Sequence, residues 1–470
     1  MYILHVFDSD GNPKRKRGAQ LLSSLTLRVA MSCVIFDRVQ YNLGLTFFCA
    51  AFICKSQKFD LEFGSLHFHV QKGQRSVNDR QKTRVLFAIG SLSGGGAERQ
   101  LIEYLTHLDR SQFVPFLYLV SEEGELRDEL PQDIAVEVFW KRHRSPRLNI
   151  AGRIYRMQVR DLADVMRLRR IDVLCTITFM LTLIGRSSVR YYPVPWVAID
   201  MADPRLDFDH STVRFRRFKK KILCKAYRET SITVAVSDGV KAGLVEYFQT
   251  PEEHIQTVYN FVDLSRIDRL VCIPCDPTFD SANFNIICIG RLQEQKGHIH
   301  LLEALDQLVN GQDRRKLVLH IFGQGPLESA LKEFVSTRRL HENVRFWGFV
   351  RSPYNYLAAA DLFCLASIYE GLPLVLLEAL TCRVPVVATD CPSGPREVLR
   401  GGMFGQLVPP ASPEALAKAI RHVIDRHDHY RDKAVAGREH VASNYSAKVG
   451  TERLQDVLSR ACSGSLHEDE

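Results

Sequence analysis

The sequence contains no apolar run long enough to cross a membrane. Its longest such stretch, residues 43–54, has 12 residues, whereas a spanning helix needs about 20. The stretch also lies too deep in the chain to be a signal peptide, which would begin at the N-terminus. Residues 1–82 have no clean periodicity, and we expect an extension that is poorly structured or comes from a misassigned start. An interfacial anchor is a third interpretation.

The sequence also lacks a disulfide framework and a nucleic-acid motif. Several of its 12 cysteines fall within apolar runs, as buried reduced thiols do, so we expect a cytoplasmic protein. The one C-x-x-C pair, Cys272 and Cys275, has no second pair and lies in an expected linker, which favours chance or structural placement over a metal or redox site. The net charge of +8 suits an anionic substrate or membrane surface, and is too weak to indicate nucleic acid.

From residue 83 onward, short apolar runs alternate with helical patterns, which predicts parallel sheets covered on both faces. The first unit is a strand at 84–90, a glycine-rich loop and a helix at 99–108. Further strands are expected at 113–120, 135–139, 172–178, 194–199, 231–236 and 255–258, with helices at 150–170, 212–228 and 238–248.

A polar stretch with two prolines, residues 263–283, separates this block from a second one. Strands are expected there at 284–290, 317–322, 344–346, 362–365, 384–388 and 406–408, with helices at 297–308, 326–339, 374–380, 413–425 and 443–460. The fold class is therefore α/β, with two tandem Rossmann-like domains at 83–265 and 283–440. Ligands of such sheets bind at the carboxyl ends of the strands, so we expect the domains to face each other across a substrate cleft.

Two carboxylates, Glu370 and Glu378, stand eight positions apart in the second domain. Glu370 follows an apolar strand, and Pro373 is well placed to open a helix that contains Glu378. The N–H groups of a helix start suit a phosphate, and a carboxylate can hold a ribose diol. The pattern predicts a site for a nucleotide sugar.

Cations lie at the same predicted sheet edge. Arg291 and Lys296 fall in the loop after the strand at 284–290, where they could neutralise a diphosphate; a solvated loop is the alternative. In the first domain, the consecutive glycines Gly94, Gly95 and Gly96 allow a ligand to approach the backbone closely, although a flexible turn explains them equally well. Their spacing matches neither GxGxxG nor the P-loop, which argues against a hydride-transfer enzyme.

Taken in order, these motifs resemble the retaining glycosyltransferases of family four, which have the GT-B fold. The matching segments are SGGGAE at 93–98, VSDGV at 236–240, VYNFVD at 258–263, GRLQEQKG at 290–297, FGQG at 322–325, YEGLP at 369–373 through Glu378 (the EX7E motif), and PVVATD at 385–390. The segment CPSGPRE at 391–397 resembles the corresponding segment of family members that build bacterial surface polysaccharides. The resemblance also implies that a C-terminal helix at about 441–462 crosses back onto the first domain.

The resemblance implies roles for individual residues. Arg291 and Lys296 would contact the donor diphosphate, Glu370 the donor sugar and Glu378 the ribose. The remaining donor-binding residues would be Gly94, Gly95, Gly96, Phe349, Val350, Gly371, Leu372, Pro373 and Leu374.

The implied function is transfer of a sugar, with retention of configuration, from a nucleotide-diphosphate sugar to a glycan or polyprenyl-linked acceptor of cell-surface polysaccharide synthesis. A UDP-sugar is the favoured donor, and no metal or other cofactor is expected. One departure concerns the acceptor side: where relatives carry Arg and Asn after an acidic residue, this chain has Met201 and Ala202. A catalytically weak nucleotide-sugar-binding protein is therefore one alternative, and a sugar-nucleotide epimerase, which shares this fold, is the other.

A basic segment with aromatic residues runs from Arg214 to Lys221 in the first domain. It could rest on anionic lipid near a lipid-linked acceptor, which would place the protein at the inner face of the plasma membrane. A solvated helix face is an equally good interpretation.

Overall fold

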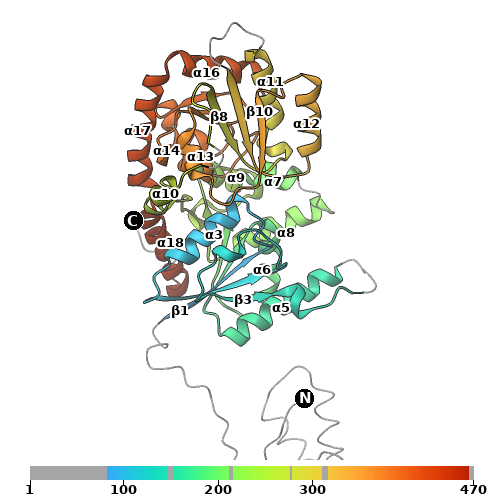
Figure 1. The fold of residues 1–470 in the computed structure, drawn as a ribbon. Helices are drawn as coiled ribbons and strands as arrows, with labels where there is room; N and C mark the ends of the chain where they lie inside the picture. Colours follow the sequence, from blue (N-terminus) through green and yellow to red (C-terminus); the bar gives the residue numbers. More distant parts are fainter. Residues whose placement is uncertain (1–81, 147–151, 211–214, 276–277, 310–315, 465–470) are drawn as a thin grey trace, which may run out of the picture. The chain divides into compact units, whose positions relative to one another are not determined.

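The computed structural model describes residues 82–146, 152–210, 215–275, 278–309 and 316–464 (Figure 1). The N-terminal extension expected at residues 1–82 lies almost wholly outside this range. The described part contains two parallel sheets, one after the other along the chain.

The first sheet has seven strands in the order β3-β2-β1-β4-β5-β6-β7, and every neighbouring pair is parallel. Its central strands are almost entirely buried because helices cover both faces, and this explains their near-continuous apolar sequences. The strands are β1 (Thr83–Ile89), β2 (Phe113–Leu119), β3 (Ala135–Val138), β4 (Val173–Ile177), β5 (Trp196–Asp200), β6 (Ile232–Ala235) and β7 (Ile255–Thr257).

Helices connect these strands. They are α3 (Gly96–His107), η2 (Arg127–Glu129), α4 (Phe139–Arg142), α5 (Arg153–Arg169), α6 (Phe179–Ser188), α7 (Pro204–His210), α8 (Arg216–Glu229), α9 (Asp238–Phe248), η3 (Glu252–His254) and α10 (Leu264–Val271).

The second sheet has six parallel strands in the order β10-β9-β8-β11-β12-β13. The strands are β8 (Phe284–Ile289), β9 (Leu317–Phe322), β10 (Val344–Gly348), β11 (Leu362–Leu365), β12 (Val386–Thr389) and β13 (Gln406–Val408). The helices are η4 (Glu294–Lys296), α11 (His298–Val309), α12 (Glu328–Thr337), α13 (Tyr354–Ala359), α14 (Leu374–Thr381), α15 (Pro395–Val398), η5 (Arg400–Gly402), α16 (Pro413–Asp425), α17 (His427–Asn444) and α18 (Ala447–Ser463).

The predicted fold class is confirmed, and each stretch expected as a strand contains one. The helices were predicted less completely. The stretch 263–283 is not only a linker, because Asp263 accepts a hydrogen bond from the Arg266 N–H and caps α10. The helix expected at 443–460 is in fact the end of α17 followed by α18, with a break after Asn444.

The last helix returns to the first sheet. α18 packs against α3, β4 and β5, as its position beside α3 in Figure 1 also shows. Gly450 of α18 is needed there, because a Cβ at that position would overlap the ring of Phe261.

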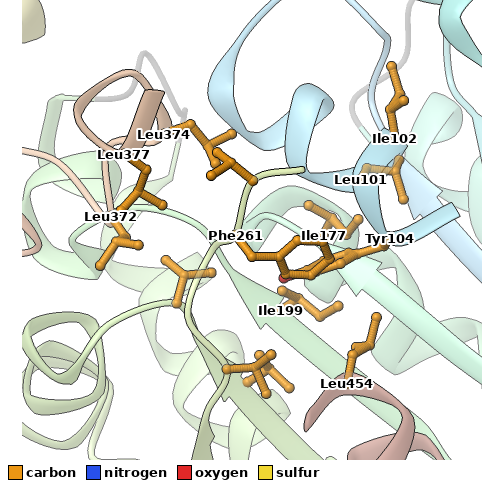
Figure 2. Packing of buried hydrophobic residues seen from close by; sticks show 14 of the residues in the cluster. Leu101, Ile102, Tyr104, Ile177, Ile199, Phe261, Leu372, Leu374, Leu377 and Leu454 are labelled. Atoms are coloured by element: carbon orange, nitrogen blue, oxygen red, sulfur yellow. The ribbon is translucent and has the colours of Figure 1, made fainter. Parts of the chain in front are cut away.

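One apolar cluster joins the two sheets around Phe261, a fully buried residue (Figure 2). Its ring lies 5.6 Å from that of Tyr104 on α3. The same cluster includes Leu372, Leu374 and Leu377, at the start of α14. The first turn of α14 is therefore fixed by packing against residues of the first domain.

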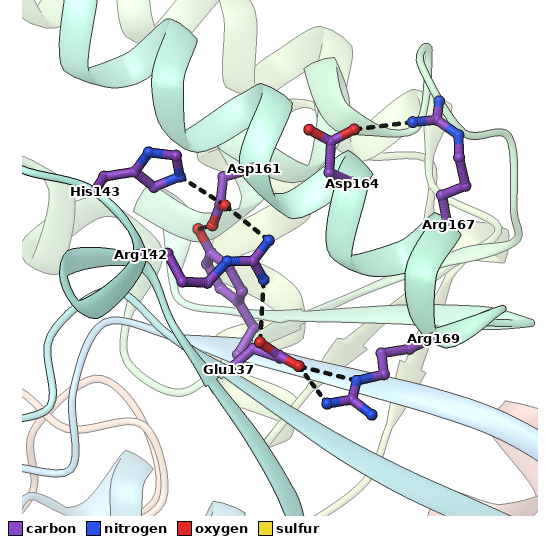
Figure 3. A network of polar contacts seen from close by, with 8 residues as sticks. Glu137, Arg142, His143, Asp161, Asp164, Arg167 and Arg169 are labelled. Carbon is purple, nitrogen blue, oxygen red and sulfur yellow. Dashed lines mark hydrogen bonds and ion pairs between the residues drawn. The ribbon is translucent and has the colours of Figure 1, made fainter. Parts of the chain in front are cut away.

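A polar network holds α5 against the edge of the first sheet (Figure 3). The buried carboxylate of Asp161 accepts hydrogen bonds from Tyr118 at 3.0 Å and pairs with His143 at 2.7 Å. Glu137 on β3 pairs with Arg142 at 3.0 Å and with Arg169 at 2.6 Å. None of these side chains belongs to the predicted site, so we assign the network a structural role.

Across the described ranges, no helix combines the length and apolarity that crossing a bilayer requires.

Candidate functional site

Glu370 lies in the loop after β11, and the structure brings it together with Lys296 from the loop after β8. The Glu370 side chain is 5% exposed, and its Oε1 accepts hydrogen bonds from Lys296 Nζ and from Ser367 Oγ, both at 2.6 Å. Gln295 ties the two loops together, because its side chain donates to the Tyr369 carbonyl. A cation and an anion are therefore held side by side at the carboxyl edge of the second sheet.

Arg291 reaches from the same edge to the first domain. Its Nη2 donates to the carbonyl of Ser93 and to Glu98 Oε1, both at 3.0 Å. A Cβ at Gly95 would lie 2.9 Å from that nitrogen, so only glycine fits there without a shift. The predicted cation and the predicted glycine loop are thus direct neighbours.

The glycine loop also meets the predicted base-binding loop after β10. Gly94 has a φ of +79°, and a Cβ there would lie 3.0 Å from Phe349 Cε2. Val350 is half-buried against the apolar cluster. Gly96 has no neighbour within 4 Å of an added Cβ, so packing does not explain this third glycine.

Two arginines fasten this base-binding loop to the first domain. Arg99 of α3 donates from Nη2 to the Arg351 carbonyl at 2.9 Å. Arg351 donates in turn to the carbonyl of Glu125 at 3.1 Å and pairs with Asp128 at 3.3 Å.

Gly371 lies so close to the first domain that only glycine fits there. It pairs with Ala202 in an isolated antiparallel bridge, and a Cβ at this position would overlap the Met201 carbonyl. Beside it, the Asp203 N–H donates to the Glu370 carbonyl at 2.9 Å. The two residues that depart from the family pattern therefore lie against the donor loop through their backbone.

The predicted donor-binding residues Leu372, Pro373 and Leu374 are buried. The Leu372 and Leu374 side chains belong to the apolar cluster, so any contact they make with a ligand must use backbone atoms. Asn260 of the first domain fixes this backbone by donating to the Leu372 carbonyl at 2.8 Å.

Glu378 is not joined to the other predicted polar residues. Within the described residues, no hydrogen bond or ion pair links it to Arg291, Lys296 or Glu370. It is 8% exposed and accepts a hydrogen bond from Tyr354 Oη at 3.1 Å. Burial raises the pKa of its carboxyl, and the charge of Arg99 opposes that shift.

Glu378 and Arg99 line a small pocket of about 20 Å³, together with Glu103, Arg266 and Tyr354. A volume of this size holds about one water molecule.

A further anchor between the domains uses the last residue of the CPSGPRE segment. The Glu397 carboxylate accepts from the N–H groups of Asp238 at 2.9 Å and Gly239 at 3.0 Å, at the start of α9. A helix N-terminus favours a negative charge, so this contact stabilises the approach of the two domains.

Two carboxyls of the first domain, those of Asp200 and Asp207, have raised pKa values. Burial raises the pKa of Asp200, at the end of β5, to about 7. Burial, with the neighbouring charge of Asp203, raises the pKa of Asp207 to about 6. Within the described residues, no group of three or more His, Cys, Asp or Glu side chains is arranged to hold a metal ion.

Several contributors could not be identified from sequence. Glu98 belongs to the SGGGAE motif, but only the folded structure shows that it pairs with Arg291. Arg99 looks like an ordinary charge on a helix surface, and Tyr354 lies on a helix that was not predicted. The sequence placed Ser367 at the end of a predicted strand, but it did not predict the hydrogen bond from Ser367 to Glu370.

In comparison with known proteins, both domains are similar to the same class of enzyme. Residues 94–266 match the family model described as Glycosyltransferase Family 4, and residues 283–426 match the model described as Glycosyl transferases group 1. Each of the two domains of the chain is therefore similar to a glycosyltransferase domain. The two sheets, with their facing carboxyl edges, are those of the GT-B fold.

Curated relatives include an N-acetylgalactosaminyltransferase of Campylobacter jejuni that acts on a diphospho-undecaprenol-linked saccharide, 30% identical over 208 residues (44% of this chain and 54% of the relative). An uncharacterized glycosyltransferase of Methanocaldococcus jannaschii is 30% identical over 176 residues (37% of this chain and 43% of the relative). The chain spans about half the length of these curated relatives.

Solved structures share the fold. HepE of Anabaena in complex with UDP superposes with a TM-score of 0.64 at 21% identity, covering 80% of this chain and 100% of that chain. A glycosyltransferase from Rickettsia africae gives a TM-score of 0.65 at 20% identity, with 81% and 98% covered.

The buried carboxyls predict a pH dependence of stability. Because the folded-state pKa values of Asp200 and Asp207 lie above their ordinary value of 3.8, the native protein binds more protons than the unfolded chain between about pH 4 and 7. The free energy of unfolding should therefore fall as the pH rises through this window. Asp200→Asn should flatten the fall, measured by urea denaturation between pH 4.5 and 8.

The exposed Asp164→Asn serves as the matched control and should keep the wild-type slope. An equally steep fall in Asp200→Asn would show that this carboxyl does not titrate as described.

Proposed function

We propose that this protein is a retaining glycosyltransferase that moves a sugar from a nucleotide-diphosphate sugar, with a UDP-sugar favoured, to a glycan or lipid-linked acceptor of cell-surface polysaccharide synthesis. The observation that carries the proposal is the convergence of Arg291, Lys296 and Glu370 at one sheet edge, against the glycine loop of the facing domain. Such a set suits a charged leaving group attached to a polar sugar.

The cations would act on the diphosphate. Arg291 and Lys296 would bind its oxygens in the ground state and stabilise the negative charge that grows as the bond to the sugar breaks. Lys296 also touches Glu370, so one ammonium group would lie between the phosphate and the carboxylate that contacts the sugar hydroxyls.

The nucleoside would occupy the other end of the site. Glu378, oriented by Tyr354, would accept hydrogen bonds from the ribose hydroxyls. Phe349 and Val350 would flank the base, and the backbone of Gly94 to Gly96 would approach the phosphates. Because the pocket at Glu378 has room for only about one water molecule, binding requires the surrounding side chains to move.

In the proposed transfer, the acceptor hydroxyl attacks the anomeric carbon on the same face as the leaving group. A bond forms between the acceptor oxygen and the anomeric carbon, and the bond from that carbon to the phosphate oxygen breaks. The electron pair leaves with the nucleotide diphosphate, and a phosphate oxygen takes the proton of the acceptor. This scheme needs neither a dedicated protein base nor a metal ion.

The relatives support the choice of substrates. HepE of Anabaena has been solved with UDP and with UDP-glucose, and the Campylobacter jejuni relative is named for a diphospho-undecaprenol-linked acceptor. A catalytically weak binding protein is the second candidate, because Met201 and Ala202 replace polar residues beside the donor loop.

Turnover should depend on both cations. Arg291→Ala or Lys296→Ala should each cost about 2–4 kcal/mol of transition-state stabilisation, because each removes a preorganised charge from the leaving group. This corresponds to a fall of roughly 30- to 1,000-fold in kcat/KM. The assay combines purified protein, radiolabelled UDP-, GDP- and ADP-sugars and a lipid extract, with and without EDTA.

Lys332→Ala, on the surface of α12, is the control and should leave transfer unchanged. Near-normal turnover in both cation variants would refute the diphosphate assignment. Conversion of the donor without an acceptor would favour an epimerase, and binding without turnover a binding protein.

The basic segment gives a second part of the proposal, in which the first domain rests on the inner face of the plasma membrane. Arg217, Lys221 and Lys225 repeat every four residues on the exposed side of α8. Phe215 and Phe218 beside them are 74% and 65% exposed. Cations with exposed aromatic rings suit an anionic lipid surface.

Not all of the segment is free for this role. Arg216 pairs with Asp209 at 2.9 Å, and Lys220 Nζ lies 3.3 Å from the centre of the Tyr247 ring. Arg214 lies outside the described residues.

Binding to vesicles tests this surface. Lys221→Glu/Lys225→Glu should weaken binding to phosphatidylglycerol vesicles by about 2 kcal/mol or more, roughly 30-fold, because each cation near the lipid contributes about 1 kcal/mol. Vesicle sedimentation measures this affinity, with phosphatidylcholine vesicles as the uncharged reference. The double variant Lys418→Glu/Lys448→Glu changes the net charge equally at other exposed sites. Equal binding by the two double variants would contradict the assignment.

A further inference from the structure

We infer that Glu98 competes with the donor diphosphate for Arg291 and thereby sets the affinity of the site for its donor. The inference rests on the proposed function, because it takes Arg291 to be a ligand of the diphosphate. It adds a residue of the acceptor domain to the residues that determine donor affinity.

Glu98 is held in place by its position on α3. It lies in the first turn of that helix, and its side chain is 13% exposed. Its Oε1 lies 3.0 Å from Arg291 Nη2, which also donates to the Ser93 carbonyl at 3.0 Å. Both hydrogens of that nitrogen therefore have acceptors in the first domain.

The chemistry of the guanidinium makes these bonds exclusive. An arginine can bind an oxyanion bidentately through its Nη1/Nη2 edge or through its Nε/Nη2 edge, and both edges use Nη2. While Nη2 donates to Ser93 and Glu98, neither edge is complete. A diphosphate must therefore displace one of these acceptors before Arg291 can grip it with two parallel hydrogen bonds.

Glu98 is the acceptor that a phosphate displaces, because its charge repels the phosphate whereas the Ser93 carbonyl is neutral. The Glu98 carboxylate also lies directly over the backbone of Gly95, so that a Cβ at that glycine would overlap it. Glu98 thus covers the two groups that the proposed site offers to the diphosphate, the Arg291 guanidinium and the glycine loop.

The domains remain joined when the hydrogen bond between Glu98 and Arg291 breaks. The next residue, Arg99, donates independently to the Arg351 carbonyl of the base-binding loop. Exchange of Glu98 for phosphate therefore changes the charge balance at Arg291 without removing the neighbouring link between the domains.

Calorimetric titration with UDP tests the inference. Glu98→Gln keeps the size of the side chain and removes its charge, so it should lower the Kd for UDP by about two- to fivefold at low salt, the range for relief from a competing, partly exposed ion pair. In the Arg291→Ala background the gain should be smaller, because only the direct repulsion between Glu98 and the phosphate remains. Glu98→Ala should act in the same direction as Glu98→Gln.

Glu123→Gln is the matched control, since it removes an exposed carboxylate of the same domain that is not paired with Arg291. Its Kd for UDP should equal that of the wild type. Unchanged or weaker binding by both Glu98 variants would overturn the inference and indicate that Glu98 orients Arg291. If Arg291→Ala itself binds UDP like the wild type, the diphosphate assignment fails instead.

Discussion

The close approach of two backbones at Gly371 is the constraint on which the site depends. This glycine lies directly behind Glu370, and it pairs with Ala202 where any side chain would overlap the Met201 carbonyl. The contact brings the carboxyl edges of the two sheets together, so loops from both domains share one junction. A larger residue at 371 would push the domains apart and separate the glycine loop from Arg291.

Around this contact the domains are joined by polar contacts as well as by the apolar cluster around Phe261. Arg291 pairs with Glu98, and Glu397 accepts from the start of α9. The Arg291 side chain is 41% exposed, so its pairing with Glu98 contributes modestly, whereas the half-buried Glu397 carboxylate is stabilised by the N–H groups that donate to it. In the proposed function Arg291 is also the group that the anionic donor engages, so donor binding would compete with this contact between the domains.

The sheets could be predicted from sequence because parallel strands covered on both faces are short and almost wholly apolar. Helices such as α6, which is buried on most sides, show no amphipathic period and were missed. Arg291, Lys296 and Glu370 could be placed at one edge because strand topology fixes where their loops lie. The roles of Glu98 and Arg99 could not be predicted, since their partners stand about 200 residues or more away on the other domain.

In the proposed function the donor lies between the two sheets, with its diphosphate at the cations and its ribose at Glu378. The most direct test of this claim is a crystal structure of the protein soaked with UDP. We predict diphosphate oxygens within hydrogen-bonding distance of Arg291 and Lys296, and ribose hydroxyls on Glu378. A nucleotide bound elsewhere, with Arg291 still on Glu98 and no phosphate on Lys296, would contradict the account.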